Sequence, residues 1–453
     1  MNRCLYRTVR NLSRFTNKMQ TFKLTDYDAY GFDLDHTLAK YKLVPLMRLC
    51  YESACDAIIN NSGYDSKLKD DIETHKDFLC KGLFLDADKG NVVKLSHDGK
   101  ILRASHGTKI MSQEELTAAY GKDLHWEHFN EAKMNVKSCG EILLNLQAGG
   151  PQEKYTFWEH VYDALNLNFQ PKAFSDNSGW FFPVLKTDPQ KYVQASSDGV
   201  KQWLRDLKQK NKCVFLMTSS AVDFASMTAE AALGPDWKSY FDLCLFNARK
   251  PGFFTDNNPF VSLDGVKENE KVSDLQPNNC YSKGNLSDLM KYISKQTGKD
   301  KPKVVYFGDS LCSDSFPANK FASWDVVLVL EEMEAEGYHP TVKDLECDDD
   351  KEDGEPAQKR KKRNVNLDID SEEEHYLLSD MWGSFFYHEE EDIKHDKHMN
   401  TFWGRIISHY NAIAVPTIEY IAGMPISHQY QRFGSEVGNT DGFSPAKPKP
   451  LLT

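Results

Sequence analysis

The 453-residue sequence lacks several signatures that would assign a function class directly. No apolar run approaches the length needed to span a bilayer, so the sequence does not predict a transmembrane protein. It contains no G-x-x-x-x-G-K-[ST] loop and no G-x-S-x-G nucleophile turn, and its 14 histidines form no H-E-x-x-H motif. Its ten cysteines form no C-x-x-C pair, which argues against a zinc cage or a disulfide framework and favours a reducing compartment such as the cytoplasm.

Composition and charge are those of a soluble globular protein. Hydrophobic residues make up 40% of the chain and charged residues 27%, with a formal net charge of -12. The length exceeds the size at which one hydrophobic core usually stops growing, so we expect at least two packed units. The negative charge disfavours broad binding to nucleic acid and suits a protein that recruits cations.

The first 18 residues differ from the rest of the chain because they carry only basic charges: Arg3, Arg7, Arg10, Arg14 and Lys18. On a helix these side chains fall within one narrow sector, opposite an apolar side. Such a segment is typical of a mitochondrial transit peptide, and it would direct the protein to mitochondria if translation starts at Met1. The alternative is that translation starts at Met19 and that residues 1–18 are an upstream extension. The sequence leaves both interpretations open.

Short apolar segments alternate with helical ones in two parts of the chain. We expect a first strand over 27–34 and, further on, strands over 213–217, 241–247, 303–307 and 324–330, with helices over 221–233 and 285–297. This alternation predicts an α/β fold with a doubly wound parallel sheet. The interval between the first strand and the second is much longer than one crossover needs, so it is expected to hold an inserted domain.

Polar side chains follow the expected strands where each one ends. They are Asp33, Asp35 and Thr37 after the first strand, Thr218, Ser219 and Ser220 after the second, Lys250 after the third, and Asp309 and Asp314 after the fourth. The carboxyl ends of parallel strands gather around one crevice, so we expect these groups to converge. Acidic groups beside a hydroxyl, helix-end amides and one lysine predict a divalent-cation site next to an anion site.

The chemistry of these groups suggests a role for each of them. Asp33 and Asp309 are natural Mg²⁺ ligands, and Asp33 can also attack phosphorus to give an aspartyl-phosphate. Asp35 can protonate the leaving alcohol and then deprotonate water. Thr218 and the amides after it can hold phosphoryl oxygens, Lys250 can offset negative charge, and Asp314 can orient Lys250 or a metal-bound water. Taken singly, each residue also has an ordinary structural explanation, such as a helix N-cap for Thr218.

The motifs resemble those of the haloacid dehalogenase superfamily and, within it, the cytosolic purine 5'-nucleotidase family. "GFDLDHTL" (31–38) is similar to the first motif of that family, "TSS" (218–220) stands where the family has Thr-Asn-Ser, "ARKPGFF" (248–254) carries the third-motif lysine, and "YFGDSLCSD" (306–314) is similar to the fourth motif. The resemblance implies that Asp33 is the nucleophile and that Asp35 is the acid/base, with its backbone carbonyl on Mg²⁺. It also implies that Asp309 is a metal ligand supported by Asp314, in a Mg²⁺-dependent phosphoric monoester hydrolase.

The resemblance also implies a domain organisation with a cap inserted into the catalytic core. The expected parts are a catalytic core over 21–42 and 190–335, a cap over 43–189, a charged disordered linker over 339–380, a C-terminal segment over 381–433 that packs on the core, and a flexible tail over 434–453. A cap of this kind excludes water and contacts the leaving group.

The expected cap is where the sequence departs from the family. Residues 134–155 are short, polar and glycine-containing where the family has a longer apolar helical stretch. The expected substrate is a small phosphomonoester, with a nucleoside 5'-monophosphate favoured; neither nucleic acid nor a membrane is expected as a partner, and a homo-oligomer is left open. Two alternatives remain: a catalytically weak or silent nucleotidase-like protein that acts through partners, and a phosphatase for another phosphomonoester, such as a sugar phosphate or a phosphoprotein.

Overall fold

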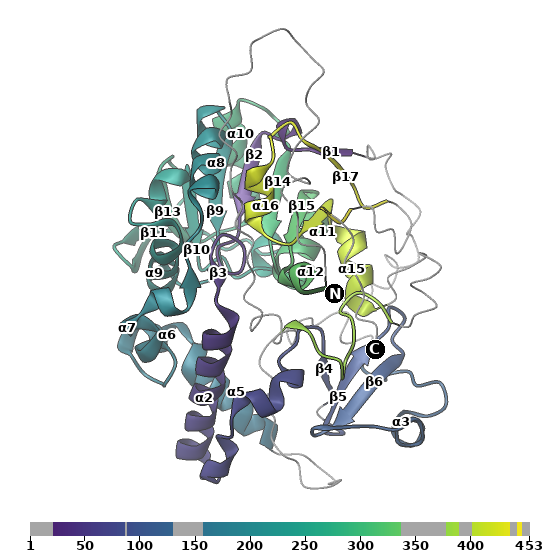
Figure 1. Ribbon diagram of the computed structural model, residues 1–453. Coiled ribbons are helices and arrows are strands. Elements are labelled where there is room, and N and C mark those ends of the chain that lie inside the picture. Colours follow the sequence, from purple (N-terminus) through teal and green to yellow (C-terminus); the bar gives the residue numbers. More distant parts are fainter. Residues whose placement is uncertain are drawn as a thin grey trace.

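The computed structural model describes residues 21–86, 88–129, 157–336, 377–388, 401–434 and 442–445. Its centre is a nine-stranded sheet, seen in Figure 1 behind α8 and α16. The strands lie in the order β12 (Lys267–Val272), β11 (Phe260–Asp264), β13 (Asn279–Lys283), β10 (Leu243–Phe246), β9 (Cys213–Met217), β2 (Ala29–Phe32), β14 (Val304–Gly308), β15 (Asp325–Val329) and β16 (Ile413–Val415).

The seven strands from β13 to β16 are parallel, which gives the α/β architecture that the sequence predicts. From the central strand β2 the chain adds β9, β10 and β13 on one side and later β14, β15 and β16 on the other. Phe32 therefore pairs with Leu216 on one side and Phe307 on the other. A ligand crevice is expected outside the carboxyl end of the strand where the order reverses, and that strand is β2.

Helices cover both faces of the sheet, which is why its strands read as continuous apolar runs. Every residue of β2, β9, β10 and β14 is buried. One face packs against α8 (Asp198–Gln209), α9 (Val222–Leu233) and α16 (Ile418–Gly423), and the other against α10 (Leu286–Thr297) and α11 (Phe316–Ala322). In α8 the buried residues are Val200, Trp203, Leu204 and Leu207, a spacing that places them on one side of the helix.

A long segment interrupts the sheet between β2 and β9. It begins after β3 (Lys40–Tyr41) and ends at β8 (Val193–Gln194), and these two strands pair with each other in antiparallel fashion. Its helical part contains α2 (Leu43–Ser62), α5 (Phe157–Phe169), α6 (Pro171–Asp176) and α7 (Phe182–Thr187). A separate four-stranded antiparallel sheet contains β4 (Phe84–Asp86), β5 (Asn91–Leu95), β6 (Ile101–His106) and β7 (Lys109–Ile110), followed by α3 (Gln113–Tyr120). Both parts lie below the large sheet in Figure 1.

The C-terminal part of the chain joins the two sheets. It supplies β16 and β17 (Gln429–Gln431), and β17 pairs with β1 (Thr21–Lys23) near the start of the described chain. It also contains α15 (Phe402–Tyr410), which contacts the small sheet. The ring centroids of Phe402 and Trp403 in this helix lie 5.2 Å and 5.5 Å from that of Phe84 in β4. Trp403 is stacked on Phe84, so α15 anchors the small sheet to the rest of the molecule.

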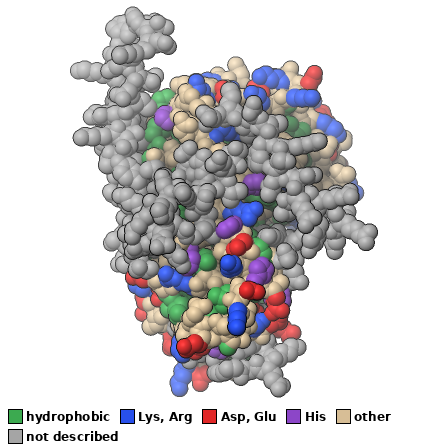
Figure 2. Space-filling view, turned by 90° about the vertical axis from the view of Figure 1, so that its right-hand side faces the viewer, with side chains coloured by type: hydrophobic (Ala, Val, Ile, Leu, Met, Phe, Trp, Pro, Cys, Tyr) green, Lys and Arg blue, Asp and Glu red, His purple; other side chains and the backbone are tan. Residues whose placement is uncertain are grey.

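Several expected segments lie outside the described residues. These are the basic N-terminal segment 1–18, residues 134–155, nearly all of the linker 339–380, and most of the tail 434–453. Within the described ranges, no helix is both long and apolar enough to cross a membrane. In Figure 2, the described part of the visible face carries acidic, basic and histidine side chains side by side, with only small hydrophobic areas between them.

Candidate active site

Asp33 stands directly after β2, at the carboxyl edge of the large sheet. Its backbone N–H donates to the Phe307 carbonyl at 2.8 Å, so the ladder between β2 and β14 fixes where the side chain starts. One carboxylate oxygen, Oδ1, accepts the Leu34 N–H at 2.9 Å and lies 2.9 Å from the ammonium of Lys250. These two contacts hold Oδ1 and thereby orient the second oxygen, Oδ2.

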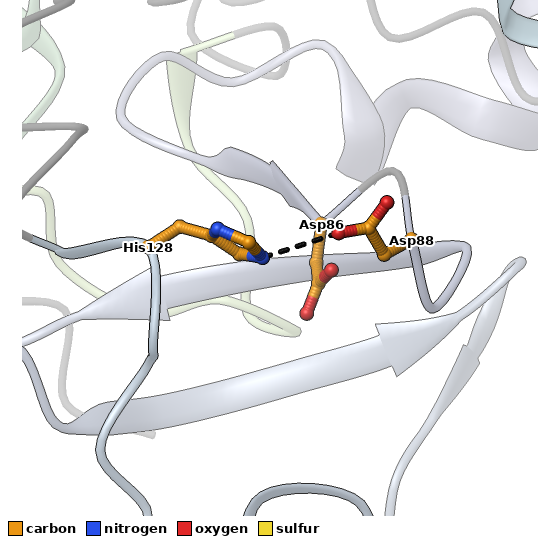
Figure 3. A group of neighbouring side chains, drawn as sticks. All are labelled: Asp86, Asp88 and His128. Atoms are coloured by element: carbon orange, nitrogen blue, oxygen red, sulfur yellow. Dashed lines mark ion pairs between the residues drawn. The ribbon is translucent and has the colours of Figure 1, made fainter.

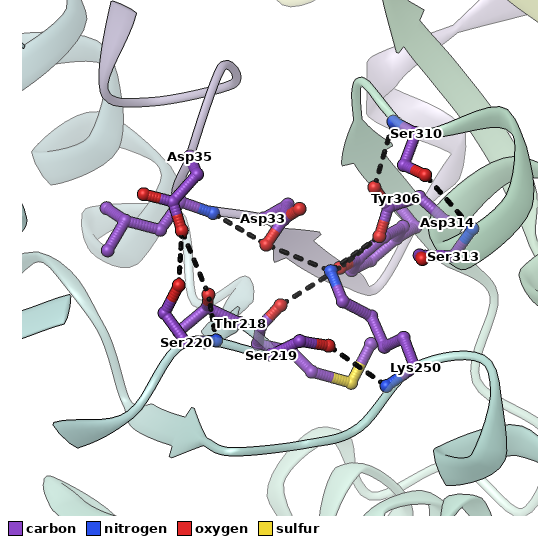
Figure 4. A network of polar contacts seen from close by, with 12 residues as sticks. Asp33, Asp35, Thr218, Ser219, Ser220, Lys250, Tyr306, Ser310, Ser313 and Asp314 are labelled. Carbon is purple, nitrogen blue, oxygen red and sulfur yellow. Dashed lines mark hydrogen bonds and ion pairs between the residues drawn. The ribbon is translucent and has the colours of Figure 1, made fainter. Parts of the chain in front are cut away.

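Lys250 reaches the same point from the loop after β10. Asn247 (φ 49°) and Arg249 (φ 53°) adopt left-handed backbone conformations, and these tight reversals turn the chain back toward the sheet. The hydroxyl of Ser219 accepts the Lys250 N–H at 3.0 Å and so ties this loop to the loop after β9. Almost completely buried, the Lys250 ammonium also lies 2.5 Å from Asp314 Oδ1 and donates to the Tyr306 hydroxyl at 2.9 Å (Figure 4).

Asp314 is held by the turn that follows β14. Its second carboxylate oxygen accepts the N–H of Ser310 at 3.1 Å, and its own N–H donates to the Ser310 carbonyl at 3.0 Å. Gly308, the last residue of β14, permits this close approach, because a Cβ there would lie 2.6 Å from the Asp314 side chain. The turn therefore delivers one carboxylate to the side of Lys250 opposite Asp33.

The carboxylate of Asp35 makes a separate set of contacts, with the loop after β9 and with Tyr41. The Ser220 hydroxyl donates to Oδ2 at 2.6 Å, and the Thr218 hydroxyl lies 3.5 Å from the same oxygen. The Tyr41 hydroxyl donates to Oδ1 at 2.6 Å. The Ser220 N–H donates to Thr218 Oγ1 at 3.1 Å, so this amide is used within its own loop, contrary to the expectation that it faces a phosphoryl oxygen.

The acidic groups of the crevice carry more charge than its lysine can balance. Ligand oxygens of Asp33, Asp309 and Asp314 all lie within 4.8 Å of one another. Burial, and after it the Asp314 carboxylate, raise the pKa of Asp33 against the opposing Lys250 ammonium. Burial also raises the pKa of Asp309 to about 6. When all three carboxylates are ionised, they and the one ammonium leave an excess of two negative charges, and a hard divalent cation with oxygen ligands fits both that charge and the donor set.

A second group of charged residues lies beside the site, and two of them, Glu331 and Lys81, were not anticipated from the sequence. Glu331 begins α12 (Glu331–Glu336), which follows β15, and lies 3.5 Å from His36 and 3.8 Å from the ammonium of Lys81. Burial alone would raise the pKa of Glu331, but Lys81 and His36 outweigh it and lower that pKa to about 2. Tyr306 was also missed, because a tyrosine inside an apolar strand resembles ordinary core packing.

The described residues contain one other group whose ligand atoms lie this close together: Asp86, Asp88 and His128 (Figure 3). Asp86 is 1% exposed, and its Oδ2 accepts the Tyr120 hydroxyl at 3.0 Å and the Trp126 indole N–H at 3.3 Å. Asp88, by contrast, is exposed and pairs with His128 at 3.2 Å. Because Asp86 is already occupied by donors from its own domain, this group has the features of a structural contact between β4 and the segment after α3.

Comparison with known proteins gives a consistent assignment. The model of the 5' nucleotidase family matches residues 15–414. The human protein named 5'-nucleotidase domain-containing protein 1 is 36% identical over 95% of this chain and 97% of its own length, and the bovine protein of that name gives the same values. Human 5'-nucleotidase domain-containing protein 2 is 27% identical over 69% of this chain and 62% of its own length.

Among solved structures, a β-phosphoglucomutase from Thermotoga maritima, described as putative, aligns at 14% identity with a TM-score of 0.25. That alignment covers 67% of this chain and 85% of the other.

Proposed function

Because the chain belongs to the 5' nucleotidase family, we propose that it is a Mg²⁺-dependent phosphatase that hydrolyses nucleoside 5'-monophosphates through an aspartyl-phosphate intermediate. One observation carries the proposal. Three loops that are far apart in the sequence bring Asp33 and Asp35, Lys250, and Asp314 to the carboxyl edge beside β2, where an α/β sheet binds its ligands.

We assign the Mg²⁺ site to the carboxylates of Asp33 and Asp309 and the backbone carbonyl of Asp35, with Asp314 as a supporting group. The excess of negative charge among the buried carboxylates supports this assignment. When bound, Mg²⁺ would screen the repulsion between these carboxylates and the phosphate.

In the first step, Asp33 Oδ2 attacks phosphorus and the bond from phosphorus to the leaving oxygen breaks. Lys250 and the Leu34 N–H hold Oδ1 during this attack. The Asp35 carboxyl gives its proton to the leaving oxygen, so that a neutral alcohol departs. We assign the hydroxyl of Thr218, which lies 3.5 Å from Asp35 Oδ2, to the phosphoryl oxygens.

In the second step, Asp35 takes a proton from water, and the resulting hydroxide attacks the phosphorus of the aspartyl-phosphate. The acyl-phosphate bond breaks, Asp33 is regenerated and inorganic phosphate leaves. Lys250 offsets the negative charge that builds on the phosphoryl group, while Asp314 and Tyr306 keep its ammonium in place.

The test uses the purified full-length protein and a panel of purine and pyrimidine 5'-monophosphates, sugar phosphates and a phosphopeptide. We expect phosphate release that requires Mg²⁺, stops with a chelator and is fastest with a nucleoside 5'-monophosphate. Replacing Asp33 by Asn should lower turnover by at least about 10³-fold, because an amide is not a nucleophile. The matched variant Asp88→Asn, in the other carboxylate group, should retain turnover.

Each result has a clear consequence. Undiminished turnover in the Asp33→Asn variant would exclude the aspartyl-phosphate. If a sugar phosphate or the phosphopeptide is turned over faster than any nucleotide, that compound class becomes the assigned substrate instead. If no ester is turned over, the protein is nucleotidase-like without hydrolase activity.

A further inference from the structure

Each oxygen of the Asp35 carboxylate accepts a hydrogen bond from a hydroxyl group. Ser220 Oγ donates to Oδ2 and Tyr41 Oη donates to Oδ1, both at 2.6 Å. Figure 4 shows the Ser220 side chain pointing at Asp35 from the loop after β9. A carboxylate with one short hydrogen bond to each oxygen has a fixed plane as well as a fixed position.

Tyr41 differs from Ser220 in where it comes from. It lies on β3, opposite Val193 of β8, and these paired strands are the point at which the chain enters and leaves the long inserted segment. The Tyr41 side chain is buried at 4% exposure, and its ring packs 4.8 Å from that of His36.

We propose that Tyr41 is a positioning residue for the proposed reaction: it holds the Asp35 carboxyl in the orientation from which the proton passes to the leaving oxygen. This inference rests on the proposed function and assigns a role to a residue that no motif of the sequence marks. Tyr41 does not contact the reacting atoms in this role. It acts through Asp35, and its attachment to the β3–β8 pair ties proton delivery to the base of the inserted segment.

The proposal predicts which substrates depend on Tyr41. When the bond from phosphorus to an alkyl oxygen breaks, the leaving alkoxide needs the Asp35 proton, so the orientation of the carboxyl limits the rate. When the leaving group is an acidic phenol such as p-nitrophenol, the departing anion is stable without that proton. Loss of Tyr41 should therefore slow alkyl esters much more than acidic aryl esters, whereas general damage to the site would slow both alike.

The experiment measures leaving-group release in a single turnover, with a series of aryl phosphates of graded leaving-group acidity and an alkyl phosphate such as a nucleoside 5'-monophosphate. Single turnover isolates the first step from hydrolysis of the intermediate. For Tyr41→Phe we expect about a tenfold slower release from the alkyl phosphate and less than about a twofold change with p-nitrophenyl phosphate. The dependence of rate on leaving-group acidity should accordingly be steeper than in the wild type. Ser220→Ala, which removes the other donor, should steepen it as well.

Tyr292→Phe is the matched control, because it also deletes one buried phenolic hydroxyl. The Tyr292 hydroxyl donates to the Asp242 carbonyl at 3.1 Å, away from the crevice, so this variant should keep the wild-type dependence. An equal loss with every ester, or no loss, in Tyr41→Phe would overturn the role of Tyr41 while leaving the proposed function intact. A wild-type protein that releases no leaving group from any ester would instead refute the proposed function itself.

Discussion

The two groups of close-lying ligand atoms show that proximity alone does not make a metal site. Asp33, Asp309 and Asp314 sit at the ends of parallel strands, with Lys250 as a buried counter-charge and more negative charge than it can offset. In Asp86, Asp88 and His128, by contrast, the one buried carboxylate is already hydrogen-bonded to an indole and a phenol. The difference teaches that charge left uncompensated by the protein, rather than the number of nearby carboxylates, distinguishes a binding site from a structural contact.

The largest expected effect comes from removing the lysine beside each group. Lys250→Met leaves Asp33 and Asp314 buried without their counter-charge, so we expect a loss of about 3–5 kcal/mol in the free energy of unfolding and at least about a hundredfold loss of turnover. Lys89, which lies 4.0 Å from Asp86 and pairs with the exposed Glu127, is the matched residue of the other group. Lys89→Met should cost less than about 1 kcal/mol and leave turnover unchanged.

Urea unfolding and initial-rate measurements on both variants provide this comparison. Equal losses of stability in Lys250→Met and Lys89→Met would mean that uncompensated buried charge does not distinguish the two groups.

The next expected effect is stabilisation by the metal. Millimolar Mg²⁺ should raise the free energy of unfolding of the wild type by about 1–3 kcal/mol, because the cation binds the folded state and offsets the excess charge of its carboxylates. Asp309→Asn should abolish the increase, whereas Asp88→Asn should preserve it. Thermal unfolding with and without Mg²⁺ measures the difference, and the reverse outcome for the two variants would move the metal site to the small sheet.

The smallest expected effect is a pH dependence in the charges around the crevice. The pKa of Glu331 in the folded protein, about 2, lies below its ordinary value of 4.5, so its contribution to stability is complete above pH 4.5 and is lost as the pH falls toward 2. At pH 7, Glu331→Gln should lower the free energy of unfolding by about 1–2 kcal/mol. The difference from the wild type should shrink as the pH is lowered below 4.5.

Unfolding measurements on the wild type and on Glu331→Gln between pH 3 and pH 7 test whether the difference in their free energies of unfolding shrinks as the pH falls. Glu127→Gln, which changes a fully exposed carboxylate near the other group, should show a weaker dependence on pH. A Glu331→Gln difference that grows on acidification would contradict the pairing with Lys81 and His36.

The large sheet was predictable from the sequence because its strands are short, apolar and bounded by turns. Strands β9, β10 and β15 lie within the ranges expected from their hydrophobic pattern, and β14 ends one residue beyond its expected range of 303–307. The antiparallel addition of β11 and β12 was not predicted, because an exposed edge strand such as β12, with the sequence "KENEKV", carries no buried face. The last parallel strand, β16, comes from beyond the charged linker and joins the sheet through a long-range pairing that no local pattern reveals.

The candidate site was predictable only in part, because it depends on the same parallel strands. Residues at strand ends could be anticipated, since the topology of a parallel sheet brings them together. The contact of Lys81 could not, because it depends on how the inserted segment folds back toward the large sheet. Tyr41, Tyr306 and Glu331 were missed because each lies in or directly beside a strand of the core without a motif that marks it. The sequence thus anticipated that the residues at the ends of the parallel strands converge, including Asp314 beside Lys250, and it gave no sign of the contacts of Tyr41, Tyr306, Lys81 and Glu331.

The pairing of β3 with β8 has a consequence for how this chain can vary. Lys40 lies opposite Gln194 in that ladder, so excision of everything between them leaves two chain ends a few ångströms apart. The intervening stretch is therefore attached to the core at one closed point of the chain. Its small sheet nevertheless shares buried side chains with the large one, since Phe84 and Val93 belong to the same hydrophobic cluster as Leu328 and Ala414, so a change of length there has to preserve that shared packing.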